Sequence, residues 1–314
     1  MKESKKPNDL LRLEKQLPAI KLRAKIINQI RLFFIRNNYM EVETPIVLNS
    51  PAPEDFINAP PAADLFLRTS PELHMKRMVA AGYNKIFQVG KCFREGEVGK
   101  FHNIEFTMLE WYQTNGNYKD ILTFLEAMLK EIVYEIFGSY RIKYNKISID
   151  FSKPWEIISV NDAFIKFTGK SPECAIRENL FEILLTEKIE PNLPKDRGVI
   201  LIDYPVEMAA LSRIHDTNPE LAERWELYLG GIEIANAYSE LTDYIEQKKR
   251  FNKAHNNRKI QNLPKYSEDD DFFESLKYGM PDFCGCALGI DRLVMILTNC
   301  VEINKIISFV EHKR

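Results

Sequence analysis

The sequence has no run of about 18 apolar residues, and its N-terminal MKESKKPNDL contains no apolar segment like that of a secretory signal. It has no internal repeat and no low-complexity segment. It also has little excess of charge of either sign, with a formal net charge of -2 over 314 residues. These absences argue against a secreted or membrane-spanning chain and against a general affinity for polyanions, so we expect a cytoplasmic protein that does not act on tRNA.

Cysteine is scarce too, and of the five cysteines only Cys284 and Cys286 are close in sequence. Two thiols at this spacing, without a second pair or a histidine cluster, are more often buried than bound to a metal. A reducing cytosol is therefore expected. Hydrophobic residues make up 45% of the chain and charged residues 28%, which is the composition of a globular protein with a sizeable core.

The first part of the chain divides into a charged tail and an amphipathic helix. We expect residues 1–16 to form a flexible tail, followed by a single domain over residues 17–314. Apolar residues from Leu22 onward follow a helical stripe that ends at Asn37. Residues 40–44 alternate like a strand and stop at a proline, which cannot donate to a sheet.

Later segments show the same helical and strand-like spacing of apolar residues. Local chemistry also marks helix starts: Ser70 suits an N-cap, Pro71 the first helical position, and SVND at residues 159–162 begins a short helix. The pattern predicts strands over 85–93, 106–113, 198–204 and 226–237, a long helix over 118–137, and a basic helix after Thr242.

Three separated stretches combine arginines, carboxylates and an aromatic residue in a way that suits one reaction. When a carboxylate attacks the α-phosphorus of ATP, the nucleophile is already ionised, so the site must supply positive charge and in-line positioning. Arginine meets this need because it is permanently charged and can grip two oxygens. The stretches are residues 93–97 (FREGE) with 102–106 (HNIEF), residues 233–243 (EIANAYSELTD) and residues 289–292 (GIDR).

These stretches resemble motifs 2 and 3 of the class II aminoacyl-tRNA synthetases, in particular those of the lysine-specific subgroup. Residues 37–45 (NNYMEVETP) resemble motif 1, which builds the dimer interface in that family. The resemblance runs from about Leu17 to the C-terminus, without the anticodon-binding OB barrel that precedes it in lysyl-tRNA synthetases. It implies an α+β catalytic fold, a mainly antiparallel sheet flanked by helices, and a homodimer.

The resemblance also implies an ATP site. Arg94 matches the motif 2 arginine at the α-phosphate, Arg292 the motif 3 arginine at the γ-phosphate, and Phe106 the ring that stacks on adenine. One position departs from the family, because Gly96 stands where motif 2 has a glutamate, so contacts to adenine at residues 95–97 are left open. Other nucleotide-binding positions implied by the match are Glu95, His102, Asn103, Glu233, Ile234 and Gly289.

The same resemblance implies a magnesium site and an amino-acid pocket. Glu233 and Glu240 match glutamates that bind Mg²⁺ on the triphosphate, and Mg²⁺ prefers such hard oxygen ligands. Ammonium groups of a lysine-like substrate need carboxylate or phenol partners once they leave water. The matching substrate positions are Ser70, Pro71, Glu72, Tyr112, Glu240 and Ala287.

Two of these positions distinguish branches of the family. Lysyl-tRNA synthetases usually have glycine where this chain has Ala287, whereas the ligases that modify elongation factor P carry serine and alanine at the positions of Ser70 and Ala287. The resemblance therefore implies ATP-dependent transfer of (R)-β-lysine, or lysine less well, to a lysine of elongation factor P. The alternatives are a free-standing lysyl-tRNA synthetase and a non-catalytic synthetase-like module that binds and regulates.

Overall fold

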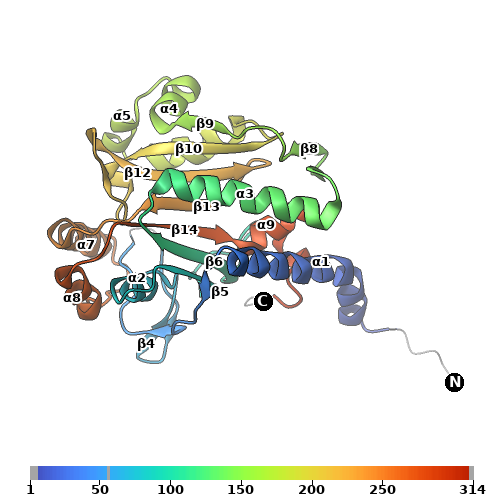
Figure 1. The fold of residues 1–314 in the computed structure, drawn as a ribbon, viewed down its shortest axis with the longest axis horizontal. Helices are drawn as coiled ribbons and strands as arrows, with labels where there is room; N and C mark the ends of the chain where they lie inside the picture. The colour runs from blue at the N-terminus through green and yellow to red at the C-terminus, as the bar shows by residue number, and fades with distance from the viewer. Residues whose placement is uncertain (1–5, 55–56, 311–314) are drawn as a thin grey trace.

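A large, mainly antiparallel sheet forms the centre of the molecule (Figure 1), and the computed structural model describes residues 6–54 and 57–310. Within those residues the sheet has nine strands, and only the β1–β5 and β9–β10 pairs are parallel. The expected α+β fold is confirmed. In spatial order the strands are β1 (Met40–Glu41), β5 (Lys85–Phe93), β6 (Glu105–Thr114), β14 (Phe283–Gly289), β13 (Ile232–Ser239), β12 (Asn218–Leu229), β10 (Gly198–Pro205) and β9 (Glu156–Ser159), with β11 (Ile214–His215) beside β12.

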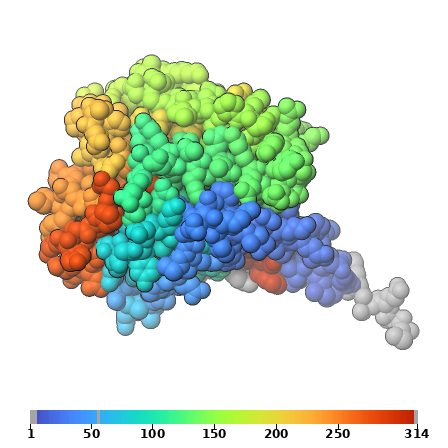
Figure 2. Space-filling view, viewed as in Figure 1, coloured from blue at the N-terminus to red at the C-terminus, as the bar shows by residue number. Residues whose placement is uncertain are grey.

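Three helices cover one face of this sheet and bury the main core against it. They are α1 (Asn8–Arg36), α3 (Tyr118–Phe137) and α9 (Ile290–Leu297). Figure 2 shows the blue atoms of α1 and the green atoms of α3 lying over that face. Alternate strand residues such as Leu109, Trp111 and Leu288 point into this core. The residues between them are left for the opposite face, where the site lies.

The first helix begins earlier than the sequence predicts. Residues 8–16, expected to be part of a flexible tail, are helical. The reason is tertiary: Gln16 is buried and donates to the Asn304 carbonyl at 2.5 Å, and Arg12 donates to the Ser308 carbonyl at 2.6 Å. Polar side chains that look solvated in the sequence therefore attach α1 to the C-terminal segment. The rest of the expected tail, residues 1–5, lies outside the described residues.

The long helix α3 forms where it is predicted because its ends are defined by local chemistry. Asn117 accepts a hydrogen bond from Asp120 N while the Asp120 side chain accepts from Asn117 N, which is a complete capping box. At the other end Gly138 has a φ of 63°, the left-handed conformation that stops a helix.

Strands β12 and β13 form a hairpin, whereas the sequence predicts one strand over residues 226–237. Gly230 and Gly231 reverse the chain with φ values of 59° and 83°, which suit a two-residue hairpin turn. The glycine pair was a turn signal in the middle of an otherwise continuous strand pattern, and the prediction overlooked it. The hairpin matters because it places the carboxylates of two strands side by side.

A small helical lobe packs on the other side of β10 and β12 and has its own apolar cluster. Ser159 caps its first helix by accepting from Asp162 N at 3.0 Å, as the SVND sequence predicts. In Figure 1 this lobe lies at the top of the molecule. Its helical segments are α4 (Val160–Thr168), α5 (Pro172–Arg177), α6 (Phe181–Leu184), the π-helical η1 (Leu185–Ile189) and η2 (Glu190–Asn192).

The remaining elements lie outside the main sheet and the helical lobe. Helix α2 packs against α8, and α8 against α7, through the apolar cluster around Phe251 and Phe272. None of the helices in the described ranges is long and apolar enough to cross a membrane. These elements are α2 (Glu72–Ala80), α7 (Tyr244–Ile260), α8 (Asp270–Tyr278), β2 (Val47–Leu48), β3 (Pro61–Ala62), β4 (Leu65–Leu67), β7 (Arg141–Tyr144), β8 (Ile147–Asp150), η3 (Val206–Met208) and η4 (Ile303–Lys305).

Candidate active site

The face of the sheet opposite α1 and α3 carries most of the residues that the sequence singled out. On β6 and β14 the alternation is regular, so Phe106, Glu110 and Tyr112 share this face with Gly285 and Ala287. A cavity opens at one end of this face. It is lined by the side chains or backbone of Arg94, Glu97, Phe101, His102, Asn103, Phe106, Thr107, Met108, Glu233, Ile234, Ala235, Asn236, Ala287, Gly289, Asp291, Arg292 and Ile303.

A β-bulge on β13 determines which carboxylates reach this face. Glu233 and Glu240 are seven residues apart, so a regular strand would point them to opposite faces. The register shifts between the pairs Leu227–Ala235 and Tyr228–Glu233, and consecutive Ile234 and Ala235 both lie in the core. The extra residue therefore returns Glu233 to the site face.

Arg292 is held at the mouth of the cavity by three contacts. Its NH1 donates to the Glu233 backbone carbonyl and to Glu233 Oε2, each at 2.9 Å, and its NH2 lies 2.6 Å from His102 Nε2. Burial and the charge of Arg292 lower the pKa of His102, so a neutral ring accepts this hydrogen bond. Burial alone would raise the pKa of Glu233, but the charges of Arg292 and Arg94 bring it below its ordinary value.

Arg94 lies on the opposite side of the same cavity. Its guanidinium is 5.2 Å from the centre of the Phe106 ring, and its NH1 is 3.6 Å from Glu97 Oε1. Gly96 has a φ of 78°, a conformation that favours glycine, and this turn leaves Glu95 exposed while Glu97 lines the cavity. The nucleotide-binding role predicted for Glu95 therefore fits Glu97 better.

The other end of the site is a closed group of carboxylates. Glu72 Oε1 accepts from Tyr238 OH at 2.9 Å and lies 2.6 Å from Lys76 Nζ, which is 2.5 Å from Glu240 Oε2. Lys76 is 0% exposed and Glu240 is 1% exposed. Burial raises the pKa of Glu240 well above its ordinary value, and the charge of Lys76 opposes that rise.

Glu110 connects two of the predicted substrate residues. Its Oε1 accepts from Ser70 Oγ at 2.6 Å, and its Oε2 accepts from Tyr112 OH at 3.0 Å. Ser70 Oγ also accepts from Glu72 N at 2.9 Å, but Pro71 is the N-cap of α2 and Glu72 its first residue, one position later than the sequence predicts. Burial and the neighbouring Glu72 raise the pKa of Glu110 to about 7.

Gly285 allows the two halves of this pocket to approach. A Cβ at this position would lie 2.3 Å from Tyr112 Cε1 and 2.4 Å from Glu240 Oε1, and neither distance is tolerable. Two residues on, Ala287 pairs with Glu110 on one side and Asn236 on the other, and it also lines the cavity with Arg94. The Ala287 methyl group thus lies where the cavity meets the carboxylates.

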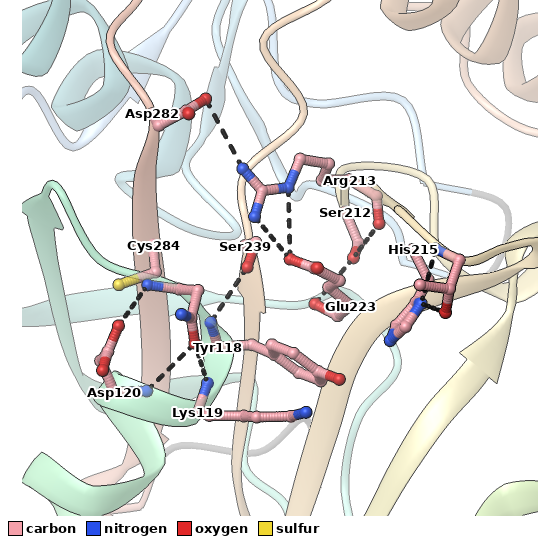
Figure 3. Close-up of polar contacts among 12 residues, drawn as sticks. Tyr118, Lys119, Asp120, Ser212, Arg213, His215, Glu223, Ser239, Asp282 and Cys284 are labelled. Carbon is pink, nitrogen blue, oxygen red and sulfur yellow. Dashed lines mark hydrogen bonds and ion pairs between the residues drawn. The ribbon is translucent and has the colours of Figure 1, made fainter.

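Behind Glu240 a set of polar contacts fixes the ends of the central strands (Figure 3). Ser239 Oγ accepts from Tyr118 N at 2.9 Å, Ser212 Oγ donates to the Glu223 carbonyl at 3.0 Å, and Arg213 pairs with Glu223 at 2.7 Å. The ring of His215 contacts Thr217, so these residues do not form a nucleophile and base. Their effect is to hold the strand that ends at Glu240.

Comparisons with known proteins agree with this geometry. Residues 4–313 match the family model described as tRNA synthetases class II (D, K and N). The chain belongs to that family. It is 37% identical to a lysine–tRNA ligase of Wigglesworthia glossinidia brevipalpis over 96% of this chain and 66% of the relative. It is 36% identical to lysine–tRNA ligase 2 of Methanosarcina acetivorans over 93% of this chain and 62% of that relative. The chain thus spans less than two thirds of the length of these curated relatives.

The magnesium ligands predicted for this class II synthetase domain need a correction. Glu233 and Glu240 lie at the two ends of β13, roughly 20 Å apart for an extended strand, so they cannot bind one ion. Glu226, on the site face of β12, is the better partner for Glu233, because the hairpin pairs Tyr228 with Glu233. Glu226 is fixed by Tyr204 OH at 2.6 Å, Tyr228 OH at 2.7 Å and Arg224 NH2 at 2.6 Å.

Several residues of the synthetase site were missed by sequence reasoning. Lys76 follows Glu72 by four positions and looks like an ordinary surface pair on a helix. Glu110 did carry a signal, as an acidic residue inside the buried strand MLEWY. Asp291 accepts from Thr107 N at 2.7 Å and lies 2.5 Å from Arg23 NH1, so it fixes the start of α9 beside Arg292. Glu54 also faces the site, where burial raises its pKa to about 7 against the charge of Arg94.

Proposed function

We propose that this chain activates a lysine-type amino acid with ATP and transfers it to a lysine side chain of elongation factor P. The observation that supports this most directly is the position of Ala287, which joins a cavity flanked by two arginines to a closed group of carboxylates on one face of one sheet. A substrate with a carboxylate at one end and ammonium groups at the other would fill both parts.

In the first step the substrate carboxylate attacks the α-phosphorus of ATP, an aminoacyl-adenylate forms, and pyrophosphate leaves. Arg94 and Arg292 would bind phosphate oxygens and offset the charge that builds up there. The residues fit a divalent ion, because Glu226 and Glu233 offer two hard oxygen ligands on adjacent strands beside both arginines. Bound there, Mg²⁺ would supply Lewis-acid polarisation of the phosphates.

In the second step an acceptor amine attacks the adenylate carbonyl. A new amide bond forms, the bond between the acyl carbon and the phosphate oxygen breaks, AMP leaves with the bonding electrons, and the proton of the amine passes to water. His102 lines the same cavity. Its Nε2 accepts a hydrogen bond from Arg292, so this ring nitrogen carries no proton. This step requires only that the acceptor reach the open end of the cavity.

Serine at position 70 and alanine at 287 favour (R)-β-lysine over lysine in this proposal. Ala287 is the register partner of Glu110, so its methyl group would crowd a substrate amine close to the carboxylate and favour one displaced along the chain. One methyl group in a pocket discriminates between two substrates by about 1 to 3 kcal/mol, so we expect a preference for (R)-β-lysine and not the exclusion of lysine. A lysyl-tRNA synthetase, as the relatives are named, is the main alternative.

Pyrophosphate exchange tests the first step. Wild type should exchange with (R)-β-lysine at a higher kcat/KM than with lysine, and Ala287→Gly should narrow that difference. Arg94→Ala should slow exchange about a hundredfold or more, as the loss of an oxyanion donor does. The exposed Arg177→Ala on α5 is a matched control and should be unaffected. Undiminished exchange by Arg94→Ala would contradict the assignment of the cavity.

Labelled amino acid, with elongation factor P and lysine tRNA as competing acceptors, tests the second step. We expect label on one lysine of elongation factor P and none on tRNA. Efficient tRNA charging with no labelled protein would make the chain a lysyl-tRNA synthetase. Exchange by neither amino acid would instead favour a non-catalytic module.

A further inference from the structure

A lysine of the protein already lies between the carboxylates of the proposed amine pocket. The Lys76 ammonium is within 2.6 Å of Glu72 and 2.5 Å of Glu240, and it lies 5.6 Å from the centre of the Tyr238 ring. Its side chain is fully buried. It comes from the middle of α2, so the backbone of a helix fixes where it can reach.

This ammonium connects carboxylates from different parts of the fold. Glu72 opens α2, whereas Glu240 follows β13, and their sequence separation means that only the tertiary structure brings them together. A buried carboxylate without a positive partner takes up a proton. Lys76 is the cation in contact with Glu240 among the described residues, and its charge opposes the rise that burial gives the pKa of Glu240.

The charges in the pocket also match a particular kind of substrate. Glu72, Glu110 and Glu240 supply three negative charges when ionised, and Lys76 neutralises one of them. Two remain, which equals the number of ammonium groups on a diamino acid. The amino acid's own carboxylate would lie at the other end of the site, beside Arg94.

We infer that Lys76 is a specificity-determining residue, whose ammonium holds Glu72 and Glu240 in place and balances one of their charges so that the pocket accepts an amino acid with a second ammonium group. The inference rests on the proposed function only in taking the pocket to be the amino-acid site. The titratable groups that face Lys76 and Glu240 are Glu72 of α2, Tyr238 of β13, Glu110 and Tyr112 of β6, and Cys284 of β14.

Binding of lysine by calorimetry, at about pH 7 and about pH 8.5, tests this role in four variants. Lys76→Met should bind at least about tenfold more weakly than wild type at pH 7, because the pKa of Glu240 rises further once the opposing charge of Lys76 is lost. The difference in lysine affinity between Lys76→Met and wild type should be smaller at pH 8.5 than at pH 7. Lys76→Met combined with Glu240→Gln should be equally weak at both pH values, because glutamine has no proton to lose. Lys76→Arg keeps the charge and should stay within a few-fold of wild type.

Lys130→Met is the matched control, since Lys130 forms the same type of pair with Glu126 on the surface of α3. It should bind lysine like wild type at both pH values. Should Lys76→Met fail to fold, Lys76→Gln replaces it, because the glutamine amide can still donate to Glu240 and support the fold. The expected loss of lysine affinity is the same, because glutamine carries no charge. The inference would be overturned if Lys76→Met bound lysine as tightly as wild type at pH 7. It would also be overturned if the double variant regained as much lysine affinity between pH 7 and pH 8.5 as Lys76→Met does.

The outcome is separable from that of the proposed function. If wild type binds lysine but catalyses no pyrophosphate exchange, the proposed adenylation is overturned. The role of Lys76 is then still tested, because it is measured by the lysine affinities of the variants. A wild type that binds neither lysine nor (R)-β-lysine at millimolar concentration overturns both.

Discussion

Buried acidic residues are the feature that most distinguishes this site at the scale of single residues. Glu110 is 2% exposed and Glu240 is 1% exposed, yet only Glu240 has an ammonium beside it. Burying a carboxylate without a cation is costly, and the raised pKa of Glu110 is the sign of that cost. A cationic substrate would relieve it.

Proton release on lysine binding should report this effect. The pKa of Glu110 is about 7 in the empty site, and a nearby ammonium favours the ionised form, so its pKa should fall on binding. We expect binding near pH 6.5 to release a fraction of a proton, and less at pH 8.5, where Glu110 is already ionised. Calorimetry in buffers of different ionisation enthalpy measures this.

Glu110→Gln is the control, because an amide cannot release a proton. When Glu110→Gln binds lysine near pH 6.5, it should release fewer protons than wild type, and the difference is the contribution of Glu110. Uptake of protons by wild type, or unchanged release in this variant, would show that another group titrates.

Residue chemistry was partly readable from the sequence. Arg94, Phe106 and Arg292 were predicted as cavity residues and do line one cavity. Lys76 and Asp291 were not, because their partners are far away in sequence and a single chain does not reveal them.

At the scale of elements, helix α7 divides its basic residues into two kinds. Arg250 is buried and donates to the carbonyls of Ala209 and Ser212 at 2.6 and 2.9 Å, and Arg258 stacks 4.2 Å from the Tyr266 ring. These two arginines fix the helix to the fold. The exposed positive charge lies on Lys249, Lys253 and Lys259.

Reversing that exposed charge should weaken an acidic partner protein's contact with α7. In the variant with Lys249, Lys253 and Lys259 all changed to Glu, we expect a several-fold loss of transfer to the acceptor with unchanged pyrophosphate exchange. Arg250→Glu should instead unfold the protein, because it leaves a buried carboxylate among carbonyls. Transfer that is insensitive to the triple reversal and to salt would rule out α7 as the docking helix.

The elements also show why pattern alone misplaces a site. The sequence pattern predicted β5 and α3 with the bounds they have, and for α3 a capping box and Gly138 define the two ends. It could not predict the bulge at Ile234, which depends on how β13 pairs with β12.

At the scale of the whole molecule, one sheet separates a core face from a site face, and an apolar surface lies beside them. Large apolar side chains are exposed on the last turns of α1 and on the segment that follows. They are Leu32 at 42%, Ile35 at 57%, Met40 at 48%, Ile46 at 43% and Val47 at 43%. Large apolar side chains left exposed in one region of a chain can belong to an interface, and this region includes residues 37–45, from whose resemblance to motif 1 a dimer is predicted.

Sedimentation should therefore detect a homodimer, and Ile35→Glu should dissociate it by placing a charge in the interface. Ile157→Glu is the matched control, since Ile157 on β9 is also 57% exposed but lies at the other edge of the sheet. A monomeric wild type, or equal dissociation in both variants, would contradict this interface.

The sequence by itself determined the class of fold, the bounds of β5 and α3 and the two arginines of the cavity, because these depend on local periodicity, capping and short motifs. Tertiary structure alone decided which carboxylates share a face. Side-chain direction in a strand changes with every residue, so one bulge on β13 and one hairpin turn at Gly230 moved Glu233 beside Glu226. Likewise Lys76 became part of the site only because the tertiary structure brings α2 close to the residue that follows β13, so that the Lys76 ammonium meets Glu240.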